Sequence, residues 1–180
     1  MSYMSAMNTK MVLEVLNDMR AEAVIQDYAL AGAVAAAVYL EPFYTKDLDV
    51  FVALERKGPL IDLSAIYGYL TARGFETKGQ WVVIGGWDVE FLPPYSPLTE
   101  QALREANVIP WENTRVRVIR PEHLVAICLE AGRIKDYERI ARFVEQQAFD
   151  ARALQPILVE HALLEKWERF MRRYEEGDTK

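Results

Sequence analysis

The 180-residue chain predicts an α+β fold, in which a small mixed β-sheet with helices packed on it is followed by a C-terminal helical subdomain. Hydrophobic residues make up 51% of the chain, which is enough for one substantial core or two small subdomains. Segments typical of a helix, a strand, a helix and then a run of strands follow one another up to residue 120. From Pro121 the sequence is helical almost to its end, so we expect an α/β core over 1–120 and a helical subdomain over 121–180.

Capping and spacing place the first elements. Asn8 or Thr9 is suited to cap a first helix, since either side chain offers an oxygen to the first free backbone amides. The apolar stripe of this helix is expected at Val12, Leu16, Met19 and Ala23. Residues 28–30 then predict a short strand that runs into Gly32, and the alanine-rich residues 33–40 predict a helix.

The middle of the chain predicts one helix and three strands. The helix covers residues 62–73 and ends at Gly74. The strands are rich in β-branched and aromatic residues, and they cover 46–53, 80–84 and 87–92, with a hairpin turn at Gly85-Gly86.

Prolines mark most of the remaining boundaries. Ser96 followed by Pro97 is typical of an N-cap and a first helical residue, so a helix is expected through Ala106. Residues 114–119 predict a further strand. Breaks in the helical C-terminal part are expected at Gly132, near Asp150, at Pro156 and near His161.

Composition excludes several classes of protein. The net charge is −6, with most of the acidic excess in the first half, so no nucleic-acid footprint covers the chain, although a local anion site is possible in the second half. No apolar run reaches the about 20 residues of a membrane span, and no membrane partner is expected. The single cysteine, Cys128, excludes an internal disulfide, and a cytoplasmic location is expected.

Five other residues attract attention, but structural roles are expected for them. Cys128 lies on an apolar helix face and is expected in the core. His123 and His161 are too few and too far apart for a zinc site, and we expect them to be surface or capping groups. Trp81 and Trp87 flank the hairpin turn and are expected to pair across the two strands.

Two aspartates interrupt the predicted strand 46–53. Asp47 and Asp49 lie two residues apart and therefore point to the same face of the sheet, where their charges repel. A divalent cation with oxygen ligands is the expected neutralising group. The alternative is an exposed edge strand that carries two aspartates by chance.

The strand 87–92 repeats this pattern with Asp88 and Glu90. If it lies beside the strand of Asp47 and Asp49, one of its acids joins the pair. Three converging carboxylates are able to hold two magnesium ions, which align an attacking hydroxyl and stabilise the leaving oxygen in phosphoryl-type displacement.

A glycine turn, a short helix, Asp-x-Asp on a strand and a later acid, in this order, resemble the nucleotidyltransferase superfamily, whose fold is shared with DNA polymerase beta. The matching residues are Gly32, Ala33, Asp47, Asp49 and Glu90. The resemblance implies that Asp47, Asp49 and Glu90 are catalytic and bind two Mg²⁺ ions, with a nucleoside triphosphate as substrate. Asp88 remains the alternative third acid.

A second match lies downstream. Residues 133–136 resemble an Arg-x-Lys-Asp element of bacterial toxin-type nucleotidyltransferases related to abortive infection, whose Thr-x-Asp-x-Asp form begins here at Thr45. The resemblance implies that Arg133 and Lys135 serve the triphosphate and that Asp136 helps to build the site. Together with Gly32, Ala33 and Thr45, these residues would bind the nucleotide. The alternative for 133–136 is a solvated, charged helix end.

The expected function is the transfer of a nucleoside monophosphate from the triphosphate to an unidentified acceptor, which is RNA, a protein or a small molecule. The toxin-type resemblance also implies an antitoxin-like protein partner. Ala33 stands where this family usually has Gly or Ser, and Cys128 stands where it often has lysine. A non-catalytic protein of the same fold, which binds a nucleotide or a partner in a toxin–antitoxin module, is therefore the alternative.

Overall fold

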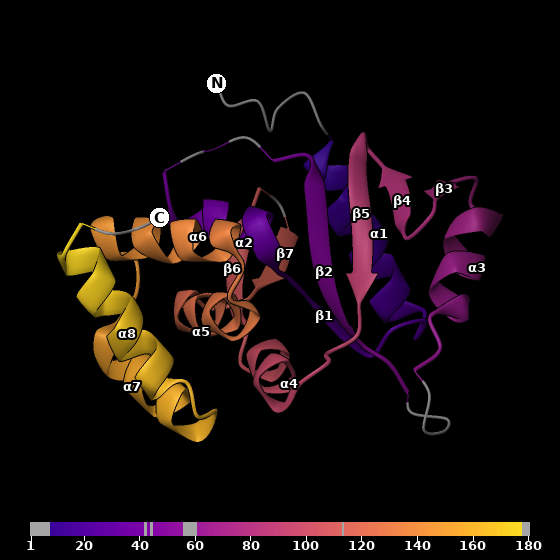
Figure 1. The fold of residues 1–180 in the computed structure, drawn as a ribbon. Coiled ribbons are helices and arrows are strands. Elements are labelled where there is room, and N and C mark those ends of the chain that lie inside the picture. The colour runs from indigo at the N-terminus through magenta and orange to yellow at the C-terminus, as the bar shows by residue number, and fades with distance from the viewer. Residues whose placement is uncertain (1–7, 42, 44, 56–60, 113, 178–180) are drawn as a thin grey trace.

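The computed structural model of the chain describes residues 8–41, 43, 45–55, 61–112 and 114–177. It confirms the predicted α+β class: one seven-stranded mixed sheet is packed with helices (Figure 1). The order across the sheet is β3-β4-β5-β2-β1-β7-β6. The strands are β1 (Asp27–Leu30), β2 (Asp47–Ala53), β3 (Glu76–Lys78), β4 (Trp81–Ile84), β5 (Trp87–Leu92), β6 (Asn107–Trp111) and β7 (Thr114–Val118).

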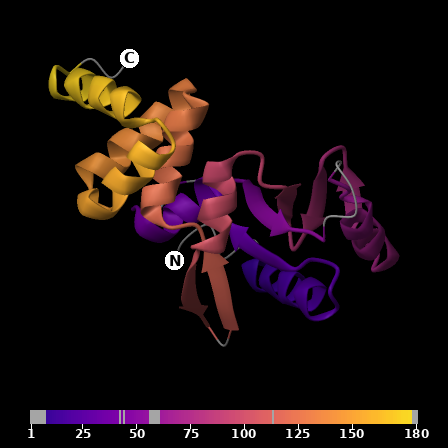
Figure 2. The ribbon, with the colours of Figure 1, turned by 90° about the horizontal axis from the view of Figure 1, so that it is seen from below.

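Helices stand at both ends of the sheet (Figures 1 and 2). Helices α5 to α8 lie at the β1–β7–β6 end of the sheet, whereas α3 lies beside β3 and β4 at the other end (Figures 1 and 2). The helices are α1 (Thr9–Ala21), α2 (Gly32–Tyr39), α3 (Ser64–Ala72), α4 (Pro97–Arg104), α5 (Pro121–Ala131), α6 (Ile134–Glu145), α7 (Ala151–Glu160) and α8 (Leu164–Glu175). None of them is both long and apolar enough to cross a membrane.

The local signals that place these elements act as the sequence predicts. The Asn8 side chain accepts a hydrogen bond from the Met11 amide at 3.0 Å and caps α1. Ser96 and Thr99 form a capping box at the start of α4, with Pro97 as the first helical residue. Gly132 ends α5 in the left-handed conformation, with φ of +66°, and so allows the tight turn into α6.

The alternation along β2 is also as predicted. Leu48, Val50 and Val52 are fully buried, and they point away from the face that carries Asp47 and Asp49. The hydrophobic core continues from the sheet into α5 to α8, and the division of the chain near residues 119–121 stays a prediction.

Two expectations about the elements are wrong, and two further strands are present. Helix α1 ends at Ala21, so Ala23 lies beyond it and is exposed. Pro156 lies inside α7 instead of ending it, because buried side chains on both sides of the proline pin the helix to the core; they are Leu154, Ile157 and Leu158. Strands β3 and β6 were not expected: β3 is short and wholly exposed, and β6 contains Pro110, which is tolerated because β6 lies at the edge of the sheet.

The two histidines differ in their surroundings. His161 follows α7 directly, as expected, and its Nε2 lies 2.6 Å from Oε1 of Gln101. His123 is instead fully buried, so the expectation of a surface or capping group is wrong. Neither of its ring nitrogens has a hydrogen-bond partner among the described residues, and the Glu105 carboxylate lies 3.7 Å from Nε2. Burial lowers the pKa of His123 to about 4, which keeps the ring neutral near neutral pH.

The buried histidine predicts a loss of stability in acid. Its pKa is about 4 in the folded state, against about 6.5 in an unfolded chain, so the unfolded chain binds more protons between these values. We expect the free energy of unfolding to be complete above pH 6.5 and to fall as the pH approaches 4, by up to about 3 kcal/mol. Urea denaturation at several pH values measures this change. His123→Leu should flatten the pH dependence, whereas His161→Asn, which leaves His123 in place, should retain it; equal effects of the two variants would contradict the assignment.

Candidate functional site

The candidate site is a cavity of about 590 Å³ above one face of the sheet. Strands β2, β4 and β5 form its floor, and the start of α2 together with α5 and α6 forms its wall. A second hollow of about 470 Å³, at the other end of β2, is mostly apolar and contains none of the predicted site residues. The residues predicted from the sequence all line the first cavity: Gly32, Ala33, Thr45, Asp47, Asp49, Glu90, Arg133, Lys135 and Asp136.

The strand register brings the acids together. Strands β2 and β5 are parallel neighbours, with Asp47 beside Asp88 and Asp49 beside Glu90. Asp88 does not line the cavity. Its carboxylate forms an ion pair with Lys46, with 3.2 Å between Oδ2 and Nζ. The structure therefore places Glu90, and not Asp88, in the cavity with the two aspartates.

The acids form a site with excess negative charge. Burial raises the pKa of Asp49; the nearby Arg139 opposes this rise, while the charge of Asp47 adds to it. Burial also raises the pKa of Glu90, as do the charges of Asp49 and Asp47, and hydrogen bonding by the Trp81 side chain lowers it. Among the described residues, no ion pair joins a cation to any of the three carboxylates.

A divalent cation suits this donor set chemically. Carboxylate oxygens are the ligands that Mg²⁺ prefers, and a cation would relieve the repulsion between Asp47, Asp49 and Glu90. As they stand, no three or more His, Cys, Asp or Glu side chains of the described residues converge closely enough to hold a metal ion. The three carboxylates lie together on the floor of the cavity, and coordination would require their side chains to close around the ion.

Gly32 allows α2 to start against β2, the strand that carries Asp47 and Asp49. It adopts a φ of +57°, and a Cβ atom at this position would overlap the Asp49 carboxylate. The Ala31 amide donates to the Asp49 carbonyl oxygen at 2.8 Å, which fixes the turn to β2. Ala31 has no side-chain oxygen to cap α2, so the first amides of the helix are left for another acceptor, such as an anion.

The turn from α5 to α6 ties two of the predicted residues to each other. Arg133 donates from Nε to Asp136 Oδ2 at 2.6 Å and from Nη2 to Oδ1 at 3.2 Å. The Arg133 amide also donates to Asp136 Oδ2, so the buried aspartate holds the start of α6. Lys135 forms no ion pair with another described residue, and its charge lowers the pKa of Asp49 from across the cavity.

Arg139 also lines the cavity, although it is missing from the predicted site. Its side chain is 19% exposed, and its Nη1 lies 4.0 Å from Asp136 Oδ1. It opposes the rise in the pKa of Asp49 more strongly than any other cation. A signal for Arg139 exists in the sequence, because it follows Lys135 by four residues and so lies on the same face of a helix.

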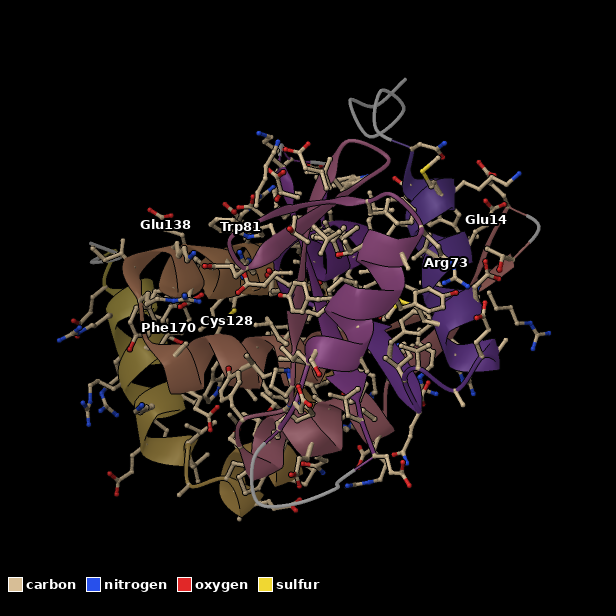
Figure 3. All side chains as sticks on the ribbon, turned by 90° about the vertical axis from the view of Figure 1, so that its right-hand side faces the viewer. Glu14, Arg73, Trp81, Cys128, Glu138 and Phe170 are labelled. Atoms are coloured by element: carbon tan, nitrogen blue, oxygen red, sulfur yellow. The ribbon has the colours of Figure 1, made fainter. Side chains whose placement is uncertain are left out.

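Cys128 is buried in the core, as expected, and also reaches the cavity wall between α5 and α6 (Figure 3). Burial raises the pKa of its thiol to about 11, so the sulfur stays protonated and is a poor nucleophile near neutral pH. Arg139 Nη1 lies 3.8 Å from its Sγ atom.

The expected pair of Trp81 and Trp87 does not form. Trp87 lies opposite Ile84, is fully buried, and donates its indole N–H to the Thr9 hydroxyl at 3.3 Å. Trp81 lies opposite Glu90 and lines the cavity. The expectation failed because the two-residue turn pairs Trp87 with Ile84, the last residue of β4, whereas Trp81 lies at the other end of that strand.

The chain has a structural counterpart among known proteins. It is similar to the crystal structure of an antigenic nucleotidyltransferase-like protein from Paracoccidioides brasiliensis, with a TM-score of 0.57. The fold is nucleotidyltransferase-like. The similarity covers 96% of this chain and 93% of that one, at 16% sequence identity. No protein-family model and no curated protein matches the sequence.

Gly32→Ala tests the close approach of α2 to β2 in this nucleotidyltransferase-like fold. We expect the free energy of unfolding to fall by at least about 1 kcal/mol, because the left-handed backbone is strained for alanine and its Cβ would displace the Asp49 side chain. Gly68→Ala is the matched control: Gly68 lies within α3 with nothing within 4 Å of an added Cβ, and this change should raise stability by about 0.5 kcal/mol. Denaturant titration measures both, and a neutral Gly32→Ala would contradict the described contact.

Proposed function

We propose that this chain is a metal-dependent nucleotidyltransferase, which moves a nucleoside monophosphate from a nucleoside triphosphate to a hydroxyl or amine of an acceptor. One observation carries the proposal: Asp47, Asp49 and Glu90 lie without ion-pair partners among the described residues on one side of a cavity, and Lys135 and Arg139 lie on the other. The nucleotidyltransferase-like fold supports the same kind of reaction.

The acids are assigned to the metal side of the site. Asp47, Asp49 and Glu90 would hold two Mg²⁺ ions, which when bound supply neutralising charge for the triphosphate and for the acceptor oxygen. Glu90 lies on β5, one strand beyond the two aspartates of β2 as counted from β1, so we assign it to the acceptor. It takes the proton that the acceptor loses.

The remaining residues bind the triphosphate. The free amides at the start of α2, from Gly32 and Ala33, face the β- and γ-phosphates. Lys135 and Arg139 offset phosphate charge from the opposite wall. Thr45 lies two residues before β2 and lines the same cavity.

The reaction balances without further reagents. The acceptor oxygen or nitrogen forms a bond to the α-phosphorus while the bond from this phosphorus to the bridging oxygen breaks. Pyrophosphate leaves with the bonding electron pair, and Glu90 receives the acceptor's proton. Burial and the neighbouring acids raise the pKa of Glu90, which brings its basicity closer to that useful for this transfer.

A labelled-nucleotide assay tests the proposal. The protein is incubated with MgCl₂, an α-labelled triphosphate of each base, and in turn bulk RNA, a protein lysate fraction and a panel of small hydroxyl and amine compounds. We expect transfer of label and release of pyrophosphate with one of these acceptor classes. Asp49→Asn should lower kcat by about 100-fold or more, because it removes a charged ligand of the metal. Transfer that is unchanged by Asp49→Asn would contradict the assignment.

One observation favours a second function, nucleotide or partner binding without turnover. Arg133 is paired with Asp136, and Ala33 brings no hydroxyl to the phosphate side, so both positions offer a triphosphate less than the family pattern implies. In this second function the chain binds a nucleotide or an antitoxin-like protein partner. For nucleotide binding without turnover, we expect a triphosphate with Mg²⁺ to raise the melting temperature of the protein while no acceptor becomes labelled.

Arg139→Gln separates triphosphate binding from simple helix stability. We expect the KM for the nucleoside triphosphate to rise about tenfold, because a charge-assisted contact to phosphate is lost. Arg142→Gln is the matched control on the same helix: its Nη2 donates to the Glu41 carbonyl oxygen at 3.3 Å, and its guanidinium lies over the Phe43 ring, away from the cavity lining. Equal changes in KM for the two variants, measured by steady-state kinetics, would contradict a phosphate role for Arg139.

A further inference from the structure

Trp81 reaches Glu90 from the next strand of the sheet. The antiparallel register of β4 and β5 places Trp81 directly opposite Glu90, and the parallel register of β5 and β2 places Glu90 beside Asp49. Directly opposed residues point to the same face, with Cβ atoms about 5 Å apart. The three side chains therefore form a row across three strands, and all three line the cavity. Figure 3 shows Trp81 toward the side of the sheet where α6 lies.

Few other groups are placed to orient Glu90. On β2, Asp47 and Asp49 repel it, and the nearby Lys46 is paired with Asp88. The Trp81 side chain, in contrast, lies directly across from Glu90 in the register of β4 and β5, and hydrogen bonding by its indole lowers the pKa of Glu90. The other ionisable groups around this part of the cavity are Tyr67 on α3, Lys78 on β3, and Arg133, Lys135 and Arg139 on the opposite wall.

We propose that Trp81 is a positioning residue, whose indole N–H holds the Glu90 carboxylate turned into the cavity. An indole N–H donates only, and a bond from it to a carboxylate is charge-assisted, so it fixes the carboxylate in one orientation. Without this bond, repulsion by Asp47 and Asp49 turns the flexible glutamate away from them, toward the exposed β3 edge. The catalytic consequence rests on the proposed function: a displaced Glu90 no longer meets the acceptor.

The indole signals test the contact without any assay of activity. The four tryptophans give four ¹H–¹⁵N indole signals, and Trp81→Phe identifies the one that belongs to Trp81. Glu90→Gln should shift this signal, because a charged acceptor becomes neutral. Asp88→Asn is the matched control on the same strand and face, and it should leave the signal in place. A Trp81 signal that ignores Glu90→Gln, or that responds equally to Asp88→Asn, would overturn the proposal.

Kinetics test the positioning role. Trp81→Phe keeps an aromatic ring but removes the N–H, so we expect kcat to fall about tenfold while the KM for the triphosphate changes less than about twofold. Trp111→Phe, on β6 and outside the cavity, is the control and should change neither. An unchanged kcat in Trp81→Phe overturns the positioning role. If the wild-type protein transfers no nucleotide, the proposed function fails, and the indole signals decide the Trp81 contact by themselves.

Discussion

The parallel pairing of β2 with β5 is the constraint on which the candidate site depends. It sets Asp49 beside Glu90, two residues along from Asp47, so that three carboxylates share the floor of one cavity. Such a cluster costs stability, because burial and mutual repulsion both disfavour the charged forms. The fold tolerates it because Leu48, Val50 and Val52 anchor the same strand in the core from the opposite face.

The C-terminal helices supply the opposite charge. Gly132 turns the chain sharply between α5 and α6, and the bond between Arg133 and Asp136 fixes the first turn of α6. Helix α8 supports α6 from outside: the rings of Tyr137 and Phe170 stack with their centroids 6.0 Å apart, and Figure 3 shows Phe170 directed toward α6 from α8. This packing holds α6 in place, and Lys135 and Arg139 of this helix line the cavity that contains the acids. Figure 2 shows α5 to α8 grouped together.

Local signals were enough to predict most of the fold. The caps at Asn8 and Ser96, the glycine at Gly132 and the alternation along β2 each act through neighbours in the sequence, and the predicted helices and strands agree with the structure to within about two residues at most ends. Strand β3 escaped prediction because it has no buried face, and the burial of His123 followed from packing between distant elements.

The candidate site was predictable where residue type and spacing carry the signal, as for Asp47 and Asp49. The places of Trp81 and Arg139 depend on strand register and helix packing, which no local pattern fixes; a shift of one residue between β4 and β5 would remove Trp81 from Glu90. The roles of all these residues, and the metal and the triphosphate, stay predictions.

A crystal structure of the protein with MnCl₂ and a non-hydrolysable nucleoside triphosphate tests the central claim most directly, because anomalous scattering locates the metal. We expect manganese between Asp47, Asp49 and Glu90, with the triphosphate between the start of α2 and the side chains of Lys135 and Arg139. Manganese bound away from these carboxylates, or a nucleotide seated in the hollow at the other end of β2, would contradict it.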